Sequence, residues 1–178
     1  MRNENTKKLV IAAMLVAIGV IGGAWSIPIG ASKCAPIQHM INILAATILG
    51  PVYGVIMAFV ISVFRNMMGT GTLLAFPGSM CGALLAGLLF NALKNRSVPG
   101  LDKALGKGTI GAIIGELFGT AVIGGICAYP VAVFMMGREA AMFTYVFPFL
   151  VSTLGGTIIG TILYIALRKT KALDKMGL

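Results

Sequence analysis

Long apolar runs with almost no charge, separated by short polar breaks, make up most of this sequence. Of its 178 residues, 58% are hydrophobic and only 11% are charged. A soluble domain of this size has too little interior to bury so much apolar surface, so the runs predict membrane-spanning helices. We expect an all-α integral membrane protein, a compact bundle of six transmembrane helices in one domain. The predicted spans are residues 8–26, 37–50, 52–68, 78–93, 108–135 and 143–167.

The positive charges lie where a membrane topology would place them. Eleven of the 14 Lys and Arg residues are at the termini or in the loop 94–107, whereas Lys33, Arg65 and Arg138 lie elsewhere. In a six-span bundle the termini and this loop face the same side, so the positive-inside rule places both termini in the cytoplasm. The net charge of +9 is therefore explained by topology, and we expect no nucleic acid partner.

The most unusual polar break is the stretch 64–79, FRNMMGTGTLLAFPGS. Arg65 and Asn66 end the third span, and a Gly/Thr loop containing Thr72 leads to Ser79 in the next span. Polar backbone and a cation are costly in a membrane unless they face a partner, a ligand or water. The stretch predicts one wall of a small-molecule site at the outer end of the bundle. The alternative for Arg65 is a side chain that reaches the lipid headgroups.

Two further groups of polar residues interrupt apolar runs. Gln38, His39 and Asn42 begin the second span, where they could bind a polar heterocycle or make interhelical contacts. Glu116 lies about 13 Å into the fifth span, at a depth where an ionisable group is usually functional. It shares a helix face with Thr120. The alternative is a structural carboxylate paired with Arg65 or His39.

The remaining patterns argue against catalysis and against a metal. His39 is the only histidine, and the three cysteines are scattered, so neither a metal site nor a disulfide framework is indicated. The sequence has no GxxxxGK[ST], HExxH or GxSxG motif, and we expect neither an enzyme nor a cofactor. Tyr129 suits an interfacial aromatic belt, with stacking on a flat ligand as the alternative.

Small residues recur at spacing four within the predicted spans. Gly111, Gly115 and Gly119 form one row, and Gly156 with Gly160 forms another. Rows of this kind let helices approach closely in lipid, where no hydrophobic force drives them together. We expect them to pack inside the bundle.

Three segments carry a resemblance to a known family. The first helix contains an AxxxA pattern at Ala13–Ala17, and the stretches KCAPIQHMINILAATILGP (33–51) and RNMMGTGTLLAFPGSMCGALLAG (65–87) are more specific. Together they resemble the ThiW subfamily of substrate-binding S components of energy-coupling factor (ECF) vitamin transporters. The similarity covers essentially the whole chain and is weakest in the charged mid-chain loop and the C-terminal tail.

The resemblance implies a subunit in the lipid bilayer of a prokaryotic cell membrane. It would bind hydroxyethylthiazole, a thiamine precursor, from outside and dock through Ala13 and Ala17 on a transmembrane T component that works with two cytoplasmic ATPases. Glu116 would accept from the ligand hydroxyl or hold Arg65 in place. The residues expected to bind the ligand are Gln38, His39, Asn42, Arg65, Asn66, Thr72, Ser79, Glu116 and Tyr129.

Two other functions remain open from the sequence. An S component for thiamine or its pyrimidine precursor is one, and a cationic ligand would favour Glu116 and aromatic residues over Arg65. The other is a stand-alone small transporter that uses Glu116 as its proton site.

Overall fold

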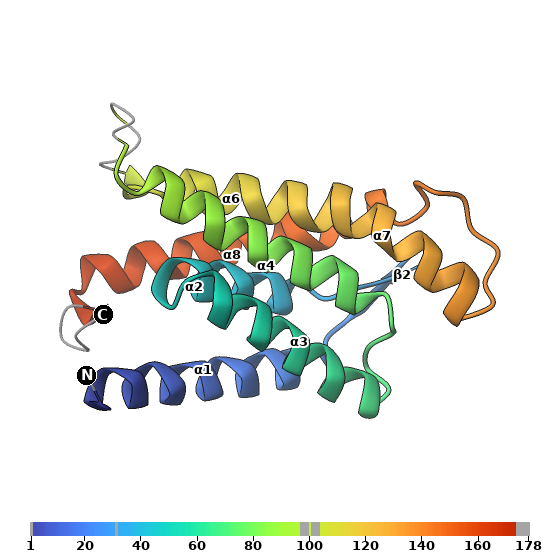
Figure 1. Ribbon diagram of the computed structural model, residues 1–178, viewed down its shortest axis with the longest axis horizontal. Helices are drawn as coiled ribbons and strands as arrows, with labels where there is room; N and C mark the ends of the chain where they lie inside the picture. Colours follow the sequence, from blue (N-terminus) through green and yellow to red (C-terminus); the bar gives the residue numbers. More distant parts are fainter. Residues whose placement is uncertain (1, 31, 97–99, 101–103, 174–178) are drawn as a thin grey trace.

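The computed structural model describes residues 2–30, 32–96, 100 and 104–173, with side chains from residue 4 onward. Its helices run alongside one another, and both ends of the described chain lie at one end of the bundle (Figure 1). The helices are α1 (Arg2–Gly22), α2 (Pro36–Ile48), α3 (Pro51–Met67), α4 (Ala75–Leu93), α6 (Thr109–Leu117), α7 (Gly125–Pro130) and α8 (Val146–Lys169). Two π-helical segments, η1 (Phe118–Gly124) and η2 (Val131–Met135), extend α6 and α7, and a hairpin is formed by β1 (Ile27–Ile29) and β2 (Ser32–Cys34).

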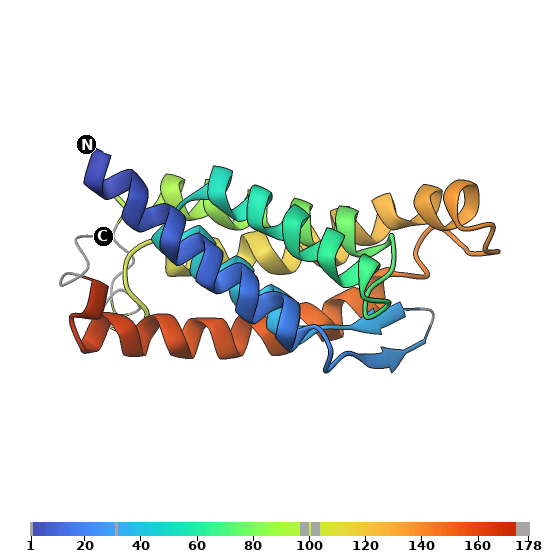
Figure 2. The same cartoon turned by 90° about the horizontal axis from the view of Figure 1, so that it is seen from below.

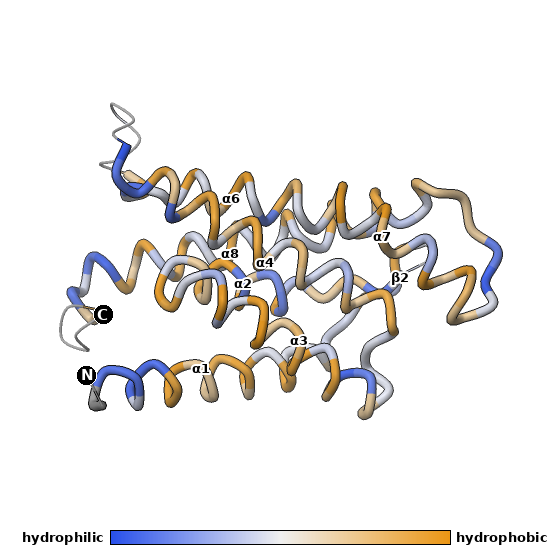
Figure 3. Tube along the Cα trace, viewed as in Figure 1, coloured by the Kyte–Doolittle hydropathy of each residue, from blue (hydrophilic) through white to orange (hydrophobic). Residues whose placement is uncertain are grey.

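Several of these helices are long and apolar enough to cross a membrane. Four described stretches meet that description, and α3 is a shorter apolar helix. Large hydrophobic side chains are exposed along α1 and α8, as expected of surfaces that face lipid. Hydrophilic residues gather mainly toward the ends of the bundle (Figure 3). The four stretches that are long and apolar enough to cross a membrane are Glu4–Gly22, Ala75–Leu93, Thr109–Met135 and Val146–Lys169.

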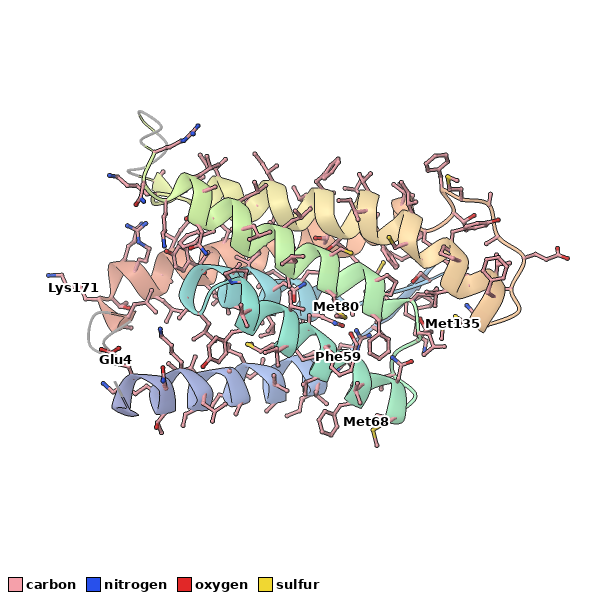
Figure 4. The ribbon with its side chains drawn as sticks, in the orientation of Figure 1. Glu4, Phe59, Met68, Met80, Met135 and Lys171 are labelled. Atoms are coloured by element: carbon pink, nitrogen blue, oxygen red, sulfur yellow. The ribbon has the colours of Figure 1, made fainter. Side chains whose placement is uncertain are left out.

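The two ends of the bundle differ in charge. Glu4 and Lys171 lie at the end that holds the termini, and Met68 and Met135 lie at the opposite end (Figure 4). The C-terminal end of α4 and the N-terminal end of α6 also lie at the end that holds the termini (Figure 1). Of the basic residues counted above, Lys103 and Lys175 fall outside the described residues.

Helix α2 is the centre of the bundle. It contacts α1, α3, α4, α6 and α8, and nine of its 13 residues are buried. At 1.5 Å per residue it is only about 20 Å long, shorter than the hydrocarbon core of a bilayer. Pro36 occupies its first turn, where the missing N–H costs nothing. The hairpin β1–β2 precedes this end of α2 and packs against α8 (Figure 2).

The glycine rows pack inside the bundle, as predicted. A side chain at Gly115 would come within 2.5 Å of the backbone of Leu85, and one at Gly119 within 2.7 Å of the carbonyl oxygen of Cys81. These positions bring α6 and η1 against α4. Gly160 likewise lies against the carbonyl oxygen of Met40, and so lets α8 approach α2.

The structure departs from the predicted elements at several helix ends, among them that of α1, which ends at Gly22 rather than residue 26. Three of the differences have a local reason. α4 begins at Ala75 rather than residue 78, because Pro77 lies in its first turn, where proline is tolerated. The segment between the first two predicted spans contains the hairpin β1–β2, in which Gly30 has φ of 56°. The fifth span is not a regular α-helix, and η2 starts directly after Pro130, which lacks the N–H that an α-helix needs.

Candidate ligand-binding site

Polar side chains from α2, α3, α4 and the α6–η1 segment meet inside the bundle, near the N-terminal end of α2. All are less than a tenth exposed, and they include the buried ionisable residues His39, Arg65 and Glu116. Such groups are costly to bury unless each finds a partner. The cluster consists of Gln38, His39, Asn42, Ser62, Arg65, Ser79, Glu116 and Thr120.

Glu116 is fully buried, and one of its carboxylate oxygens carries the contacts. Oε1 lies 2.8 Å from Nδ1 of His39 and accepts hydrogen bonds from Asn42 Nδ2 at 3.0 Å and Thr120 Oγ1 at 3.1 Å. These three contacts offset part of the cost of burying the carboxyl group. The other oxygen, Oε2, has no partner among the described residues and faces Gly82 on α4.

The buried Arg65 belongs to a separate chain of hydrogen bonds. Its NH1 donates to Oε1 of Gln38, whose Nε2 donates to Ser62 Oγ at 3.0 Å. The hydroxyls of Ser62 and Ser79 are 3.2 Å apart, and Ser79 donates to the carbonyl oxygen of Ala75 at 2.8 Å. Because Arg65 can only donate and that carbonyl can only accept, the direction of every bond between them is fixed.

Of the two structural partners that the sequence allowed for Glu116, the structure selects His39. Arg65 is instead bonded to Gln38 and, through NH2, to the carbonyl oxygen of Thr70 at 3.3 Å. Glu116 therefore does not hold Arg65 in place.

A cavity of about 30 Å³ lies between the cluster, the hairpin and the loop after α3. This volume holds one or two water molecules, so even a ligand with a single ring requires a wall to move. Two side-chain hydrogen bonds join this loop to the hairpin and the residue before it. Lys33 Nζ donates to the carbonyl oxygen of Gly69 at 3.2 Å, and Ser26 donates to that of Thr70 at 3.4 Å.

The predicted site residues take different positions around this cavity. Gln38, His39, Arg65, Thr72 and Ser79 line it.

Three others lie near it without lining it. Asn42 and Glu116 lie beneath it, bonded to each other. Asn66 holds the loop, because its Nδ2 donates to the carbonyl oxygens of Ser62 at 2.8 Å and Thr72 at 3.0 Å.

Tyr129 lies apart from the cluster. It lines a surface depression of about 340 Å³ together with residues of the loop after η2, including Arg138 and Glu139.

Sequence reasoning did not select several residues that line the cavity. Lys33 comes from the hairpin, and Phe149 and Ser152 come from α8. Ser152 Oγ accepts a hydrogen bond from the backbone N–H of Ala35 at 2.8 Å and so ties α8 to the start of α2. The only sequence signal for Ser152 was its place one turn after Phe149 in an apolar span, and that signal is weak.

No metal site accompanies this cluster. Within the described residues, no group of three or more His, Cys, Asp and Glu side chains could hold a metal ion. The site offers hydrogen bonds, two cations and apolar contacts, which suits binding of a small organic molecule.

Comparison with protein families adds the decisive observation. The family described as thiamine-precursor transporter protein (ThiW) matches residues 9–170. The chain belongs to the ThiW family. The match covers both segments that carry the polar cluster on α2 and α3, and all of α4 to η2. No curated protein sequence matches the ThiW chain at a significant level.

A solved structure has the same fold as this ThiW protein. It is described as the S component of a bacterial ECF transporter, with a TM-score of 0.65 and 20% sequence identity. The alignment covers 94% of this chain and 96% of the other. ThiW membership and the apolar helices together identify a multi-pass membrane transport protein rather than an enzyme.

Proposed function

We propose that this ThiW protein is the substrate-capture subunit of an ECF-type importer and that it binds hydroxyethylthiazole from outside the cell. The single observation that carries the proposal is the buried polar cavity at the N-terminal end of α2, in a chain of the ThiW family. We place this cavity on the outer side because it lies toward the end of the bundle opposite the basic termini.

The lining of the cavity suits a small aromatic ring with few polar atoms. Phe149 and Leu74 offer apolar surface, and Gln38, Ser79 and Arg65 offer hydrogen bonds. Ligand pockets generally combine such apolar walls with a few placed polar groups. Hydroxyethylthiazole has one ring nitrogen that accepts a hydrogen bond and one hydroxyl that can donate or accept.

The charges around the cavity favour the thiazole over thiamine. Lys33 and Arg65 are the charged side chains among its described lining residues, and Glu116 lies beneath with Oε1 occupied by three polar groups. Thiamine carries a fixed positive charge on its thiazolium ring, which these two cations would repel. Free hydroxyethylthiazole is neutral at physiological pH and meets no such repulsion.

The exposed face of α1 suits docking on a partner in the membrane. Ala13 and Ala17 are exposed on this helix, and their small side chains leave a shallow surface. Small residues allow helices to approach closely in lipid. We propose that this face contacts a T component, which two cytoplasmic ATPases energise, because the chain has no phosphate-binding loop of its own.

Uptake of labelled hydroxyethylthiazole by cells tests the proposal. The ThiW protein should support uptake when it is co-expressed with a T component and two ATPases, and should support none when the ATPases carry inactivating substitutions. Proton-driven uptake by the chain alone in liposomes would instead favour a stand-alone transporter. Uptake of only thiamine or its pyrimidine precursor would contradict the proposed ligand.

A further inference from the structure

The two ring nitrogens of His39 have different surroundings. Nδ1 lies 2.8 Å from Glu116 Oε1, in the fully buried part of the cluster. The ring also lines the cavity, and within the described chain Nε2 has no hydrogen-bond partner. His39 therefore joins the buried carboxylate to the space where a ligand would lie.

The surroundings of Glu116 Oε1 favour one tautomer of His39. Oε1 of Glu116 already accepts from Asn42 and Thr120, so we infer that it accepts from His39 as well and that Nδ1 is the donor. In the neutral imidazole the other nitrogen is then an acceptor, because the hydrogen bond made by one nitrogen sets the state of the other. Asn42 and Thr120 bond to the same carboxylate oxygen, at 3.0 and 3.1 Å, and hold it in position.

Among the side chains that line this cavity, the hydroxyls of Ser32 and Thr72 are also free to accept, whereas the charged and amide groups and Ser79 are already engaged. Lys33 and Arg65 can only donate. Gln38 already uses its oxygen for Arg65 and its nitrogen for Ser62. The hydroxyl of Ser79 already contacts Ser62 and donates to the carbonyl oxygen of Ala75.

We propose that Nε2 of His39 selects the ligand by accepting a hydrogen bond from its hydroxyl group, and that Glu116 is the positioning residue that keeps Nε2 in the acceptor form. This proposal rests on the proposed function, since it assumes that a hydroxyalkyl thiazole enters the cavity. It assigns Glu116 an indirect role, in which the carboxylate holds the histidine and the histidine contacts the ligand.

A matched pair of ligands isolates this hydrogen bond. In 5-(2-chloroethyl)-4-methylthiazole, chlorine replaces the hydroxyl of hydroxyethylthiazole at similar size but cannot donate. Sites built to bind a hydroxyl discriminate against analogues that lack it. Titration calorimetry of the purified protein should show the alcohol binding at least about tenfold more tightly than the chloride, because one buried acceptor would be left without a partner.

Two substitutions of His39 test whether this residue is responsible. In His39→Asn the amide nitrogen can take the place of Nδ1 and still donate to Glu116, but nothing takes the place of Nε2. The alcohol should then bind no better than the chloride, and this ratio of the two affinities is the readout, whatever happens to either affinity alone. In His39→Gln the longer side chain can place an amide oxygen near the position of Nε2, and part of the preference should return. The same alcohol preference in His39→Asn as in the wild type would overturn the proposal.

The wild-type protein offers a second test that needs no variant. His39 is the only histidine in the chain, so ¹⁵N-histidine labelling gives one pair of ring nitrogen resonances in the NMR spectrum. We expect a protonated Nδ1 and an unprotonated Nε2, with the Nε2 resonance shifting when the alcohol is added and much less when the chloride is added. A protonated Nε2 in the alcohol complex would overturn the proposal.

These outcomes also distinguish the proposed function from the proposed role of His39. If the wild type binds neither thiazole, the proposed function fails. If it binds both thiazoles with equal affinity, the proposed function stands and the role of His39 is refuted.

Discussion

The backbone of Gly82 on α4 lies directly against the carboxylate of Glu116. A side chain at this position would come within 2.7 Å of Oε2 and still closer to the hydroxyl of Thr120. Because Gly82 has no side chain, α4 leaves space for the carboxyl group of Glu116 on α6. This contact places the carboxylate beneath the cavity and lets Asn42 and His39 reach it from α2.

Gly82→Ala should disturb the site and destabilise the protein. The added methyl group has to displace Glu116 and Thr120, and overpacking of this kind costs about 1–3 kcal/mol. We expect a lower thermal unfolding midpoint and weaker thiazole binding. Gly54→Ala on α3 is the matched control, since its methyl group would lie 3.5 Å or more from its neighbours. Equal midpoints for the two variants would contradict this packing.

Glu116→Gln and Asn42→Ala should each weaken thiazole binding at least several-fold. Both changes alter the hydrogen bonds that hold His39, and a lost bond to a charged group is worth about 1.5–3 kcal/mol. Calorimetric titration measures the effect. Thr47→Ala is a suitable control, because this hydroxyl bonds only to carbonyl oxygens of its own helix. Unchanged affinity in both variants would remove these residues from the site.

Ala13→Trp and Ala17→Trp should abolish transport and leave ligand binding intact. Each tryptophan would project from the exposed face of α1 and prevent close approach of a partner helix, while no residue of α1 is among the described residues that line the cavity. Uptake and calorimetry on the same variants separate the two effects. Ile162→Trp, on the exposed face of α8, should leave transport unchanged. Loss of binding in the alanine variants would refute an interface role.

Lys33→Gln should speed the exchange of ligand. The lysine bridges the hairpin and the loop after α3 through its bond to the carbonyl oxygen of Gly69. An exposed bond of this kind is worth at most about 1 kcal/mol, so we expect dissociation to be up to about fivefold faster in stopped-flow fluorescence. Arg138→Gln, at the same end of the molecule, serves as the control. An unchanged dissociation rate for Lys33→Gln would mean that this bond does not hold the cavity closed.

Much of this site could be predicted from the sequence because membrane burial makes polar residues conspicuous. Arg65, Gln38 and Glu116 interrupt apolar runs, and the structure brings them into one cluster through a short central helix. The pairing of Glu116 with His39 rather than Arg65 could not be predicted, since it depends on how the helices are rotated against one another.

The other differences between the predictions from sequence and the structure arise from long-range contacts and from local backbone chemistry. Ser152 lies 117 residues from Ala35 in sequence, yet the two are bonded at the edge of the cavity. Tyr129 follows the π-helical segment η1, and lies apart from the polar cluster. Pro77 suggested a helix boundary, but its place in the first turn of α4 made it compatible with the helix.

The most direct test of the account is calorimetric titration of the purified wild-type protein with hydroxyethylthiazole, the pyrimidine precursor and thiamine. The account predicts saturable binding of the neutral thiazole and at least about tenfold weaker binding of thiamine, whose positive charge would face Lys33 and Arg65 in the cavity. Tighter binding of thiamine or of the pyrimidine than of the thiazole would contradict it.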